Sequence, residues 1–116
     1  MSISITEHGT VDVIQLPSRL VMANAASVRK EIQARVKDGR THTVLDLGQT
    51  SFMDSSGLSV LVSVLKSVHK VGGEVVLLNL GDDVRALVEL TRMHEVFKIF
   101  GELQTACAHV SGGNTA

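Results

Sequence analysis

The start of the chain alternates apolar and polar residues in two short runs. Ile3 and Ile5 belong to the first run, and Val11 and Val13 belong to the second. Alternation with a period of two is typical of strands that bury one face. Because the turn-prone residues 7–10 separate the runs, the pattern predicts an antiparallel hairpin.

A helical period follows, after Pro17 and Ser18 interrupt the strand pattern. Asn24 or Ser27 is the expected cap, because such side-chain oxygens accept hydrogen bonds from the first helical amides. Residues 38–39, Asp-Gly, are expected to end the helix. Its buried face is predicted from residues at helical spacing: Ala25, Val28, Ile32 and Val36.

Two buried strands and the most apolar helix come next. Residues 43–47 and 75–78 are short and mostly apolar, as expected of central strands covered on both faces. A helix over 56–70 joins them, which predicts a right-handed parallel crossover. The glycines of residues 71–73 close this helix. Two apolar stripes predict two packing surfaces: Leu58, Leu61, Val62 and Leu65, and beside them Val60, Val64 and Val68.

The last third of the chain predicts two further helices and a short strand. One helix starts at residues 81–83, residues 96–100 form a strand or extended connection, and Leu103 to Val110 form the last helix. This element order predicts one α/β domain over residues 1–110, with a small sheet packed against helices. Residues 111–116 are expected to be a flexible C-terminal tail.

The composition is that of one folded domain and argues against several classes of partner. Among 116 residues with a net charge of -1, Lys and Arg form no cluster and Trp and Tyr are absent, so nucleic-acid binding is not expected. The first residues do not resemble a signal peptide, and no run approaches the ~20 apolar residues of a membrane span. Because Cys107 has no second cysteine to pair with, a cytoplasmic location is expected.

Residues 50–58 lie between a buried strand and the start of the most apolar helix, and they carry the candidate chemistry. A helix N-terminus offers unpaired amides and a partial positive charge, so it tolerates a phosphate or another anion. Ser56 is placed to use this, and Gly57 permits close approach of the backbone. The residues alone favour a simpler interpretation, in which Asp54, Ser55 and Ser56 are N-cap residues.

Other sites are poorly supported by the sequence. The histidines stand singly, without the spacing of a zinc site, so no metal is expected; they are His8, His42, His69, His94 and His109. Cys107 is interpreted as a buried apolar residue. A hydrolase elbow requires a glycine where Asp54 stands, and Gly72 follows a helix rather than a strand, unlike a phosphate-binding loop. The chain is therefore not expected to be an enzyme.

Residues 52–58, Phe-Met-Asp-Ser-Ser-Gly-Leu, follow the strand 44–47, and this arrangement resembles the signature of anti-sigma factor antagonists with a STAS domain. The resemblance extends from about Ile3 to about Val110 and includes Leu90-Thr91 before residues 97–100. It implies the STAS fold, a mixed sheet of four to five strands packed with about four helices.

The resemblance also implies a phosphorylation switch. In that family the second serine of the motif, here Ser56, is phosphorylated by an anti-sigma factor that is also a serine kinase, and a serine phosphatase restores it. By the same match, Asp54 and Ser55 join Ser56 in the partner-binding surface, and Gly57 belongs to its tight helix start. No cofactor is implied, since ATP and magnesium belong to the kinase. The chain is expected to be a monomer or a weak dimer.

The chain departs from the family pattern before the first helix. A Gly-x-Leu-Asp pattern is common there, which would place a glycine at Ser18 and an acid at Val21. The departure removes one carboxylate expected near the phosphosite. An alternative function is therefore a constitutive STAS interaction module, in a signalling scaffold or lipid-transport complex, whose serines only cap the helix.

Overall fold

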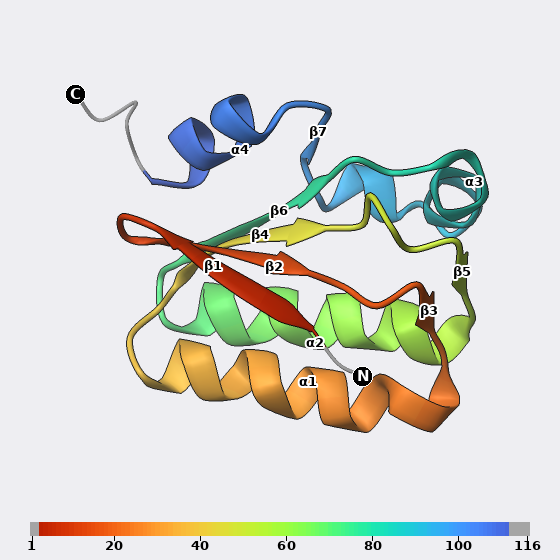
Figure 1. Cartoon of the computed structure of the whole chain (residues 1–116), viewed down its shortest axis with the longest axis horizontal. Coiled ribbons are helices and arrows are strands. Elements are labelled where there is room, and N and C mark those ends of the chain that lie inside the picture. Colours follow the sequence, from red (N-terminus) through yellow and green to blue (C-terminus); the bar gives the residue numbers. More distant parts are fainter. Residues whose placement is uncertain (1–2, 112–116) are drawn as a thin grey trace.

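A five-stranded mixed sheet forms the centre of the protein in the computed structural model, which describes residues 3–111 (Figure 1). The strand order is β1-β2-β4-β6-β7; β1 runs antiparallel to β2, and the other neighbours are parallel. A separate parallel pair, β3-β5, lies beyond the end of this sheet. The strands are β1 Ser4–His8, β2 Val11–Gln15, β3 Arg19–Leu20, β4 His42–Asp46, β5 Phe52–Met53, β6 Glu74–Leu78 and β7 Ile99–Phe100.

The helices cover the two faces of the sheet. Helices α1 and α2 lie side by side on one face, α4 lies on the other, and α3 stands at one end (Figure 1). No helix within residues 3–111 has the length and apolar character needed to cross a membrane. The helices are α1 Met22–Lys37, α2 Ser55–Lys70, α3 Asp82–Leu90, the short 3-10 helix η1 Met93–Glu95, and α4 Leu103–Val110.

Most predicted elements are confirmed. The hairpin pairs Ile5 with Ile14 across a turn at Gly9, whose φ of 64° favours glycine. Strands β4 and β6 are parallel on either side of the α2 crossover, as the apolar pattern predicts. Of the expected tail, Ser111 directly follows α4, and residues 112–116 lie outside the described part.

The predicted start of the first helix is wrong. Helix α1 begins at Met22, before both expected caps, Asn24 and Ser27. Asn24 still contributes, but from inside the helix, because its Oδ1 accepts a hydrogen bond from the backbone N–H of Val21 at 2.9 Å. The next helix also starts one residue early, at Ser55. The two-residue strands β3 and β5 are not in the sequence prediction.

The core has two layers because β4 and β6 are covered on both faces. Successive side chains of a strand point to opposite faces, so Leu45 and Leu77 pack under α1 and α2, whereas Val44 and Val76 pack under α4. Cys107 lies half-buried beside this second layer, and burial raises the pKa of its thiol. The sequence prediction of a buried cysteine is therefore confirmed in part.

The apolar stripe of α2 formed by Val60, Val64 and Val68 is fully buried, which confirms that it belongs to the core. Leu61, from the other stripe, is also fully buried, whereas Leu58 and its neighbours on that stripe are half-buried. The helix therefore packs against both the sheet and α1.

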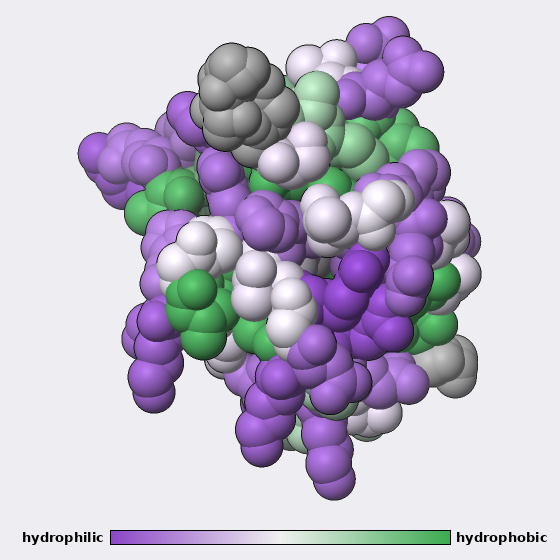
Figure 2. Space-filling model, turned by 90° about the vertical axis from the view of Figure 1, so that its left-hand side faces the viewer, coloured by the Kyte–Doolittle hydropathy of each residue, from purple (hydrophilic) through white to green (hydrophobic). Residues whose placement is uncertain are grey.

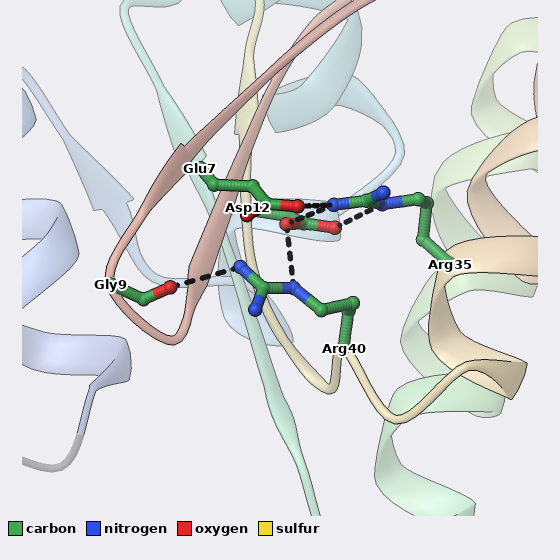
Figure 3. A network of polar contacts seen from close by, with 5 residues as sticks. All are labelled: Glu7, Gly9, Asp12, Arg35 and Arg40. Atoms are coloured by element: carbon green, nitrogen blue, oxygen red, sulfur yellow. Dashed lines mark hydrogen bonds and ion pairs between the residues drawn. The ribbon is translucent and has the colours of Figure 1, made fainter.

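A buried carboxylate ties the sheet to the C-terminal end of α1 (Figure 3). Asp12 of β2 is fully buried and faces α1. Arg35 donates to it through Nε at 2.8 Å and through Nη2 at 2.9 Å, and Arg40 donates through Nε at 2.9 Å. Arg35 also donates to the carboxylate of Glu7 at 2.7 Å, and Arg40 also donates to the carbonyl oxygen of Gly9 at 3.0 Å. The network joins the hairpin, α1 and the loop that leads into β4.

The two arginines hold Asp12 in its charged form. Burial by itself raises the pKa of this carboxyl, but the hydrogen bonds and charges of Arg35 and Arg40 outweigh burial and leave the pKa below its ordinary value. Burying a charge is costly unless it is paired and hydrogen-bonded. The sequence analysis did not identify this network, because Asp12 is simply a polar residue between Val11 and Val13 in a strand of alternating pattern.

The face at this end of the molecule is mostly hydrophilic (Figure 2). It carries the β1–β2 turn and the C-terminal ends of α1 and α2. Apolar residues on this face are scattered among long polar side chains. The view therefore shows no broad apolar surface for a partner at the end that carries the Asp12 network.

Replacing Asp12 by Asn is expected to lower the free energy of unfolding by about 3 kcal/mol at neutral pH, because two partly buried arginines lose their shared anion. Urea-induced unfolding measures this loss, and Glu7→Gln, which removes the exposed carboxylate paired with the same Arg35, is expected to lose much less. Since the folded pKa of Asp12 is depressed, its stabilisation is present above its unfolded pKa and is lost as the pH falls through the folded value. The difference between wild type and Asp12→Asn should therefore begin to shrink near pH 4, close to the ordinary aspartate pKa of about 3.9, and should vanish only below the depressed folded pKa. Equal urea midpoints at neutral pH would contradict this role.

Candidate functional site

The candidate motif forms the junction between β5 and α2. Phe52 and Met53 make up β5, Asp54 is the extended residue that precedes the helix, and Ser55 begins α2. The predicted strand-to-helix context is therefore confirmed. The strand that leads directly into the helix is the short β5, and not the buried strand β4.

Asp54 caps two helices with one carboxylate. Its Oδ1 accepts hydrogen bonds from the backbone N–H groups of Ser56 at 2.9 Å and Gly57 at 3.1 Å, at the start of α2. Its Oδ2 accepts from the backbone N–H of Met22 at 3.2 Å, at the start of α1. A negative charge also suits the positive ends of both helix dipoles. The carboxylate therefore joins the N-termini of two neighbouring helices.

Backbone pairing brings these two helix starts together. Leu20 of β3 lies opposite Met53 of β5, and the N–H of Asp54 donates to the carbonyl oxygen of Leu20 at 3.3 Å. One step earlier, the N–H of Ser51 donates to the carbonyl oxygen of Ser18 at 2.8 Å. Because each short strand leads directly into a helix, pairing β3 with β5 places the first turns of α1 and α2 side by side.

Val21 stands where the family pattern has an acid, and it offers no side-chain acceptor to α1. The Oδ2 of Asp54 serves the N–H of Met22, the first residue of that helix. The Nδ2 of Asn24 donates to the carbonyl oxygen of Arg19 at 2.8 Å and fixes the preceding segment. The start of α1 is therefore stabilised without an acid at position 21.

Gly57 is buried, and its missing side chain permits close contact within the protein itself. A Cβ atom there would lie 2.4 Å from the Cγ of Met53 and 2.6 Å from the carbonyl oxygen of Leu20. Real Cβ contacts are never this short. The glycine is needed so that the first turn of α2 can pack against the β3-β5 pair.

The serine hydroxyls do not cap the helix. Ser55 is exposed and Ser56 is half-buried, and within residues 3–111 neither hydroxyl makes a hydrogen bond. Of the three residues expected as caps from sequence alone, only Asp54 performs this task. The hydroxyl of Ser56 is therefore available for other chemistry.

Ser56 opens into a shallow hollow of about 410 Å³ between the N-terminal halves of α1 and α2. The residues that line it are short, apart from one methionine and one arginine: Met22, Ala25, Ala26, Arg29, Ser55, Ser56 and Ser59. The sequence analysis did not connect these α1 residues with the motif, since only the side-by-side packing of the helices brings them together.

Two exposed apolar side chains lie beside the motif. Met22 is 74% exposed and Phe52 is 45% exposed. The guanidinium of Arg19 lies 4.7 Å from the centre of the Phe52 ring, a cation–π contact. Apolar side chains around a free hydroxyl are well suited to contact another protein.

The histidines and acids do not form a competing site. Within the described part of the chain, no three His, Cys, Asp or Glu side chains are placed to hold a metal ion. The Nε2 of His109 lies 2.6 Å from Glu74, and its ring lies 5.4 Å from that of Phe100, so this half-buried histidine joins α4 to the sheet. His8, His69 and His94 are exposed, and His42 is half-buried.

Comparison with known proteins places this geometry in a family. The model of the STAS domain matches residues 2–106. The chain belongs to the STAS domain family. The anti-sigma-B factor antagonist of Listeria monocytogenes is 32% identical over 101 residues, which cover 85% of this chain and 88% of that protein. BtrV of Bordetella bronchiseptica, a candidate anti-sigma factor antagonist by its description, is 35% identical over 86 residues, which cover 74% of each chain.

Solved structures confirm the STAS fold. The anti-sigma factor antagonist SpoIIAA in its unphosphorylated form has a TM-score of 0.83 at 22% identity, with 96% of this chain and 97% of that chain covered. The phosphorylated form of this Bacillus cell fate determinant has a TM-score of 0.75 at 21% identity, with 94% and 99% covered. At these identities the likeness establishes the fold alone. The expected mixed sheet with four main helices is confirmed.

Replacing Asp54 by Ala is expected to destabilise this STAS domain by about 1–2 kcal/mol, because the amides at both helix starts lose their acceptor. Asn has one acceptor oxygen in place of two, so its side chain can cap only one of the two helices. The stability of Asp54→Asn should therefore lie between that of wild type and that of Asp54→Ala. Chemical unfolding orders the three proteins, and hydrogen exchange at Met22 and Ser56 shows which helix start has lost protection. An Asp54→Asn protein as stable as wild type, with both amides still protected, would disprove the double cap.

Gly57→Ala is expected to lower the free energy of unfolding by about 1–3 kcal/mol, because the added methyl group overlaps Met53 and the Leu20 backbone. Gly101→Ala is the matched control, since a Cβ atom at Gly101 meets nothing within 4 Å and its backbone is unstrained. Thermal unfolding of both variants distinguishes a packing requirement from a general effect of replacing glycine. Similar losses in the two variants would argue against the packing requirement.

Proposed function

We propose that this STAS domain is an anti-sigma factor antagonist. It binds an anti-sigma factor that is also a serine kinase when Ser56 carries a free hydroxyl, and it is released when Ser56 is phosphorylated. The single observation that carries this proposal is the division of tasks at the motif: Asp54 caps the helix, and the hydroxyl of Ser56 is left unbonded within the described residues. The naming of the Listeria relative supports the same function.

The binding surface we propose centres on residues 54–57 and extends to their exposed neighbours. Ser55 and Ser56 contact the partner directly, and Asp54 and Gly57 set the position of that turn. Met22 and Phe52 add exposed apolar surface on either side. Such a surface, with apolar side chains around a small polar centre, has the composition of a protein interface.

Phosphorylation would weaken this interface without unfolding the domain. A phosphate adds about -1.5 to -2 charges and three strong acceptors where the partner had met a hydroxyl. A hundredfold loss of affinity corresponds to roughly 2.7 kcal/mol, which burying a poorly matched charge readily supplies. Because Asp54 and the β3-β5 pair fix the helix starts, the switch we propose acts through local charge and bulk on a nearly rigid surface.

The other roles follow from this mechanism. A serine phosphatase returns Ser56 to its free form, and ATP with magnesium belongs to the kinase. The chain itself is proposed to catalyse nothing, to act in the cytoplasm and to be a monomer or a weak dimer.

Incubation with ATP and the anti-sigma factor kinase encoded nearest its gene is expected to add one phosphate to wild type and to Ser55→Ala, but none to Ser56→Ala. Intact-mass spectrometry and peptide mapping measure this outcome, and Ser55→Ala is the matched control because it removes the adjacent hydroxyl. The phosphorylated protein should bind the kinase about a hundredfold more weakly than the free protein in a titration.

Two results would contradict the proposal. Phosphate on Ser55 in place of Ser56 would move the switch to the wrong residue. Stable binding of the partner with no phosphate on wild type would favour a constitutive interaction module.

A further inference from the structure

Among residues 3–111, one charged side chain lines the hollow beside Ser56. Arg29 of α1 lines it together with Ser56, and the other lining residues are uncharged: Met22, Ala25, Ala26, Ser55 and Ser59. Arg35 and Arg40, further along the same region, are occupied by Asp12. The guanidinium of Arg29, by contrast, makes no hydrogen bond or ion pair within residues 3–111.

Helix geometry directs Arg29 toward Ser56. The Cα–Cβ bonds of an α-helix tilt toward its N-terminus, and the N-termini of α1 and α2 are joined by Asp54. A side chain in the second turn of α1 therefore leans toward the end of α2 that carries Ser56. Ala26, one turn before Arg29, and Ser59, one turn after Ser56, are short enough to leave space between them.

A phosphate on Ser56 would need a counter-charge at this position. Asp54 already places a carboxylate oxygen 2.9 Å from the backbone nitrogen of Ser56. A phosphate dianion on the neighbouring hydroxyl would meet this like charge, and the amides of Ser56 and Gly57 are already bonded to Asp54. A guanidinium matches a phosphate with two parallel hydrogen bonds, and in the part of the chain that the structure describes Arg29 is the one cation that lines the hollow.

We propose that Arg29 is the phosphate-binding residue of this domain, and that it holds the phosphate of Ser56 within the hollow between α1 and α2. This inference rests on the proposed phosphorylation of Ser56. The ion pair offsets the repulsion from Asp54 and fills the hollow that the unphosphorylated protein presents to its partner. Phosphorylation then changes the surface of α1 as well as that of α2.

The test uses phosphoserine placed at position 56 during synthesis by genetic code expansion, so that no kinase is required. Phosphorus NMR follows the second ionisation of the phosphate, near pH 6 for a free phosphoserine. The pKa of the phosphate is expected to be lower by about half a unit or more in wild type than in Arg29→Met, since a close cation favours the dianion. Lys30→Met, which removes an exposed charge from the next position of α1, is the matched control and should match wild type.

A second measurement follows the arginine itself. The Nε–H signal of Arg29 should shift when wild type carries the phosphate, and a nitrogen-correlated spectrum of each unphosphorylated variant verifies its fold. An unchanged phosphate titration in Arg29→Met would overturn the inference, as would an equal change in Arg19→Met, which would assign the phosphate to the arginine over Phe52. Failure of the kinase to modify Ser56 would instead refute the proposed function and leave the NMR result intact.

Discussion

The carboxylate of Asp54, shared between the first turns of two helices, is the interaction on which the functional end of this protein depends. Helices α1 and α2 start side by side because the short strands β3 and β5 pair and because Gly57 lets α2 approach their backbone. Adjacent helix starts bring unbonded amides and partial positive charge together. The carboxylate of Asp54 accepts hydrogen bonds from the amides of both helices and is attracted to both partial positive charges. The shape of the surface around Ser56 follows from this interaction.

Within residues 54–57, the residues that stabilise the turn are different from the serines that are available for modification. Asp54 bonds the helix amides and Gly57 supplies the close packing, so neither serine hydroxyl is needed to hold the turn. A hydroxyl with no structural bond can be modified without dismantling the helix that presents it. The same turn can therefore be rigid in shape and changeable in charge, which suits a surface that a partner must recognise in one state and reject in another.

The sequence predicted the elements whose signal is local. The alternation of apolar and polar residues predicted the hairpin. The many apolar residues of α2 and of strands β4 and β6 predicted the central crossover. It did not predict β3 and β5, because two residues carry no period and their pairing joins positions more than thirty residues apart. The sequence analysis missed the hydrogen bond from Met22 to Asp54 and the Asp12 network for the same reason. Their partners are far apart in the sequence, and the local pattern around each residue carries no sign of the other. The motif resemblance identified Ser56, but only packing shows that α1 forms half of its surroundings.

The Asp12 network also limits how the length of α1 can vary. Its N-terminus is held at Met22 by Asp54, and Arg35 near its other end is held by Asp12. Each residue turns an α-helix by about 100°, so inserting or deleting one residue between these points would rotate Arg35 away from the buried carboxylate. A whole turn would restore that rotation but would displace Arg35 by about 5.4 Å along the helix axis. The length of α1 is thus fixed by two acids, one at each of its ends.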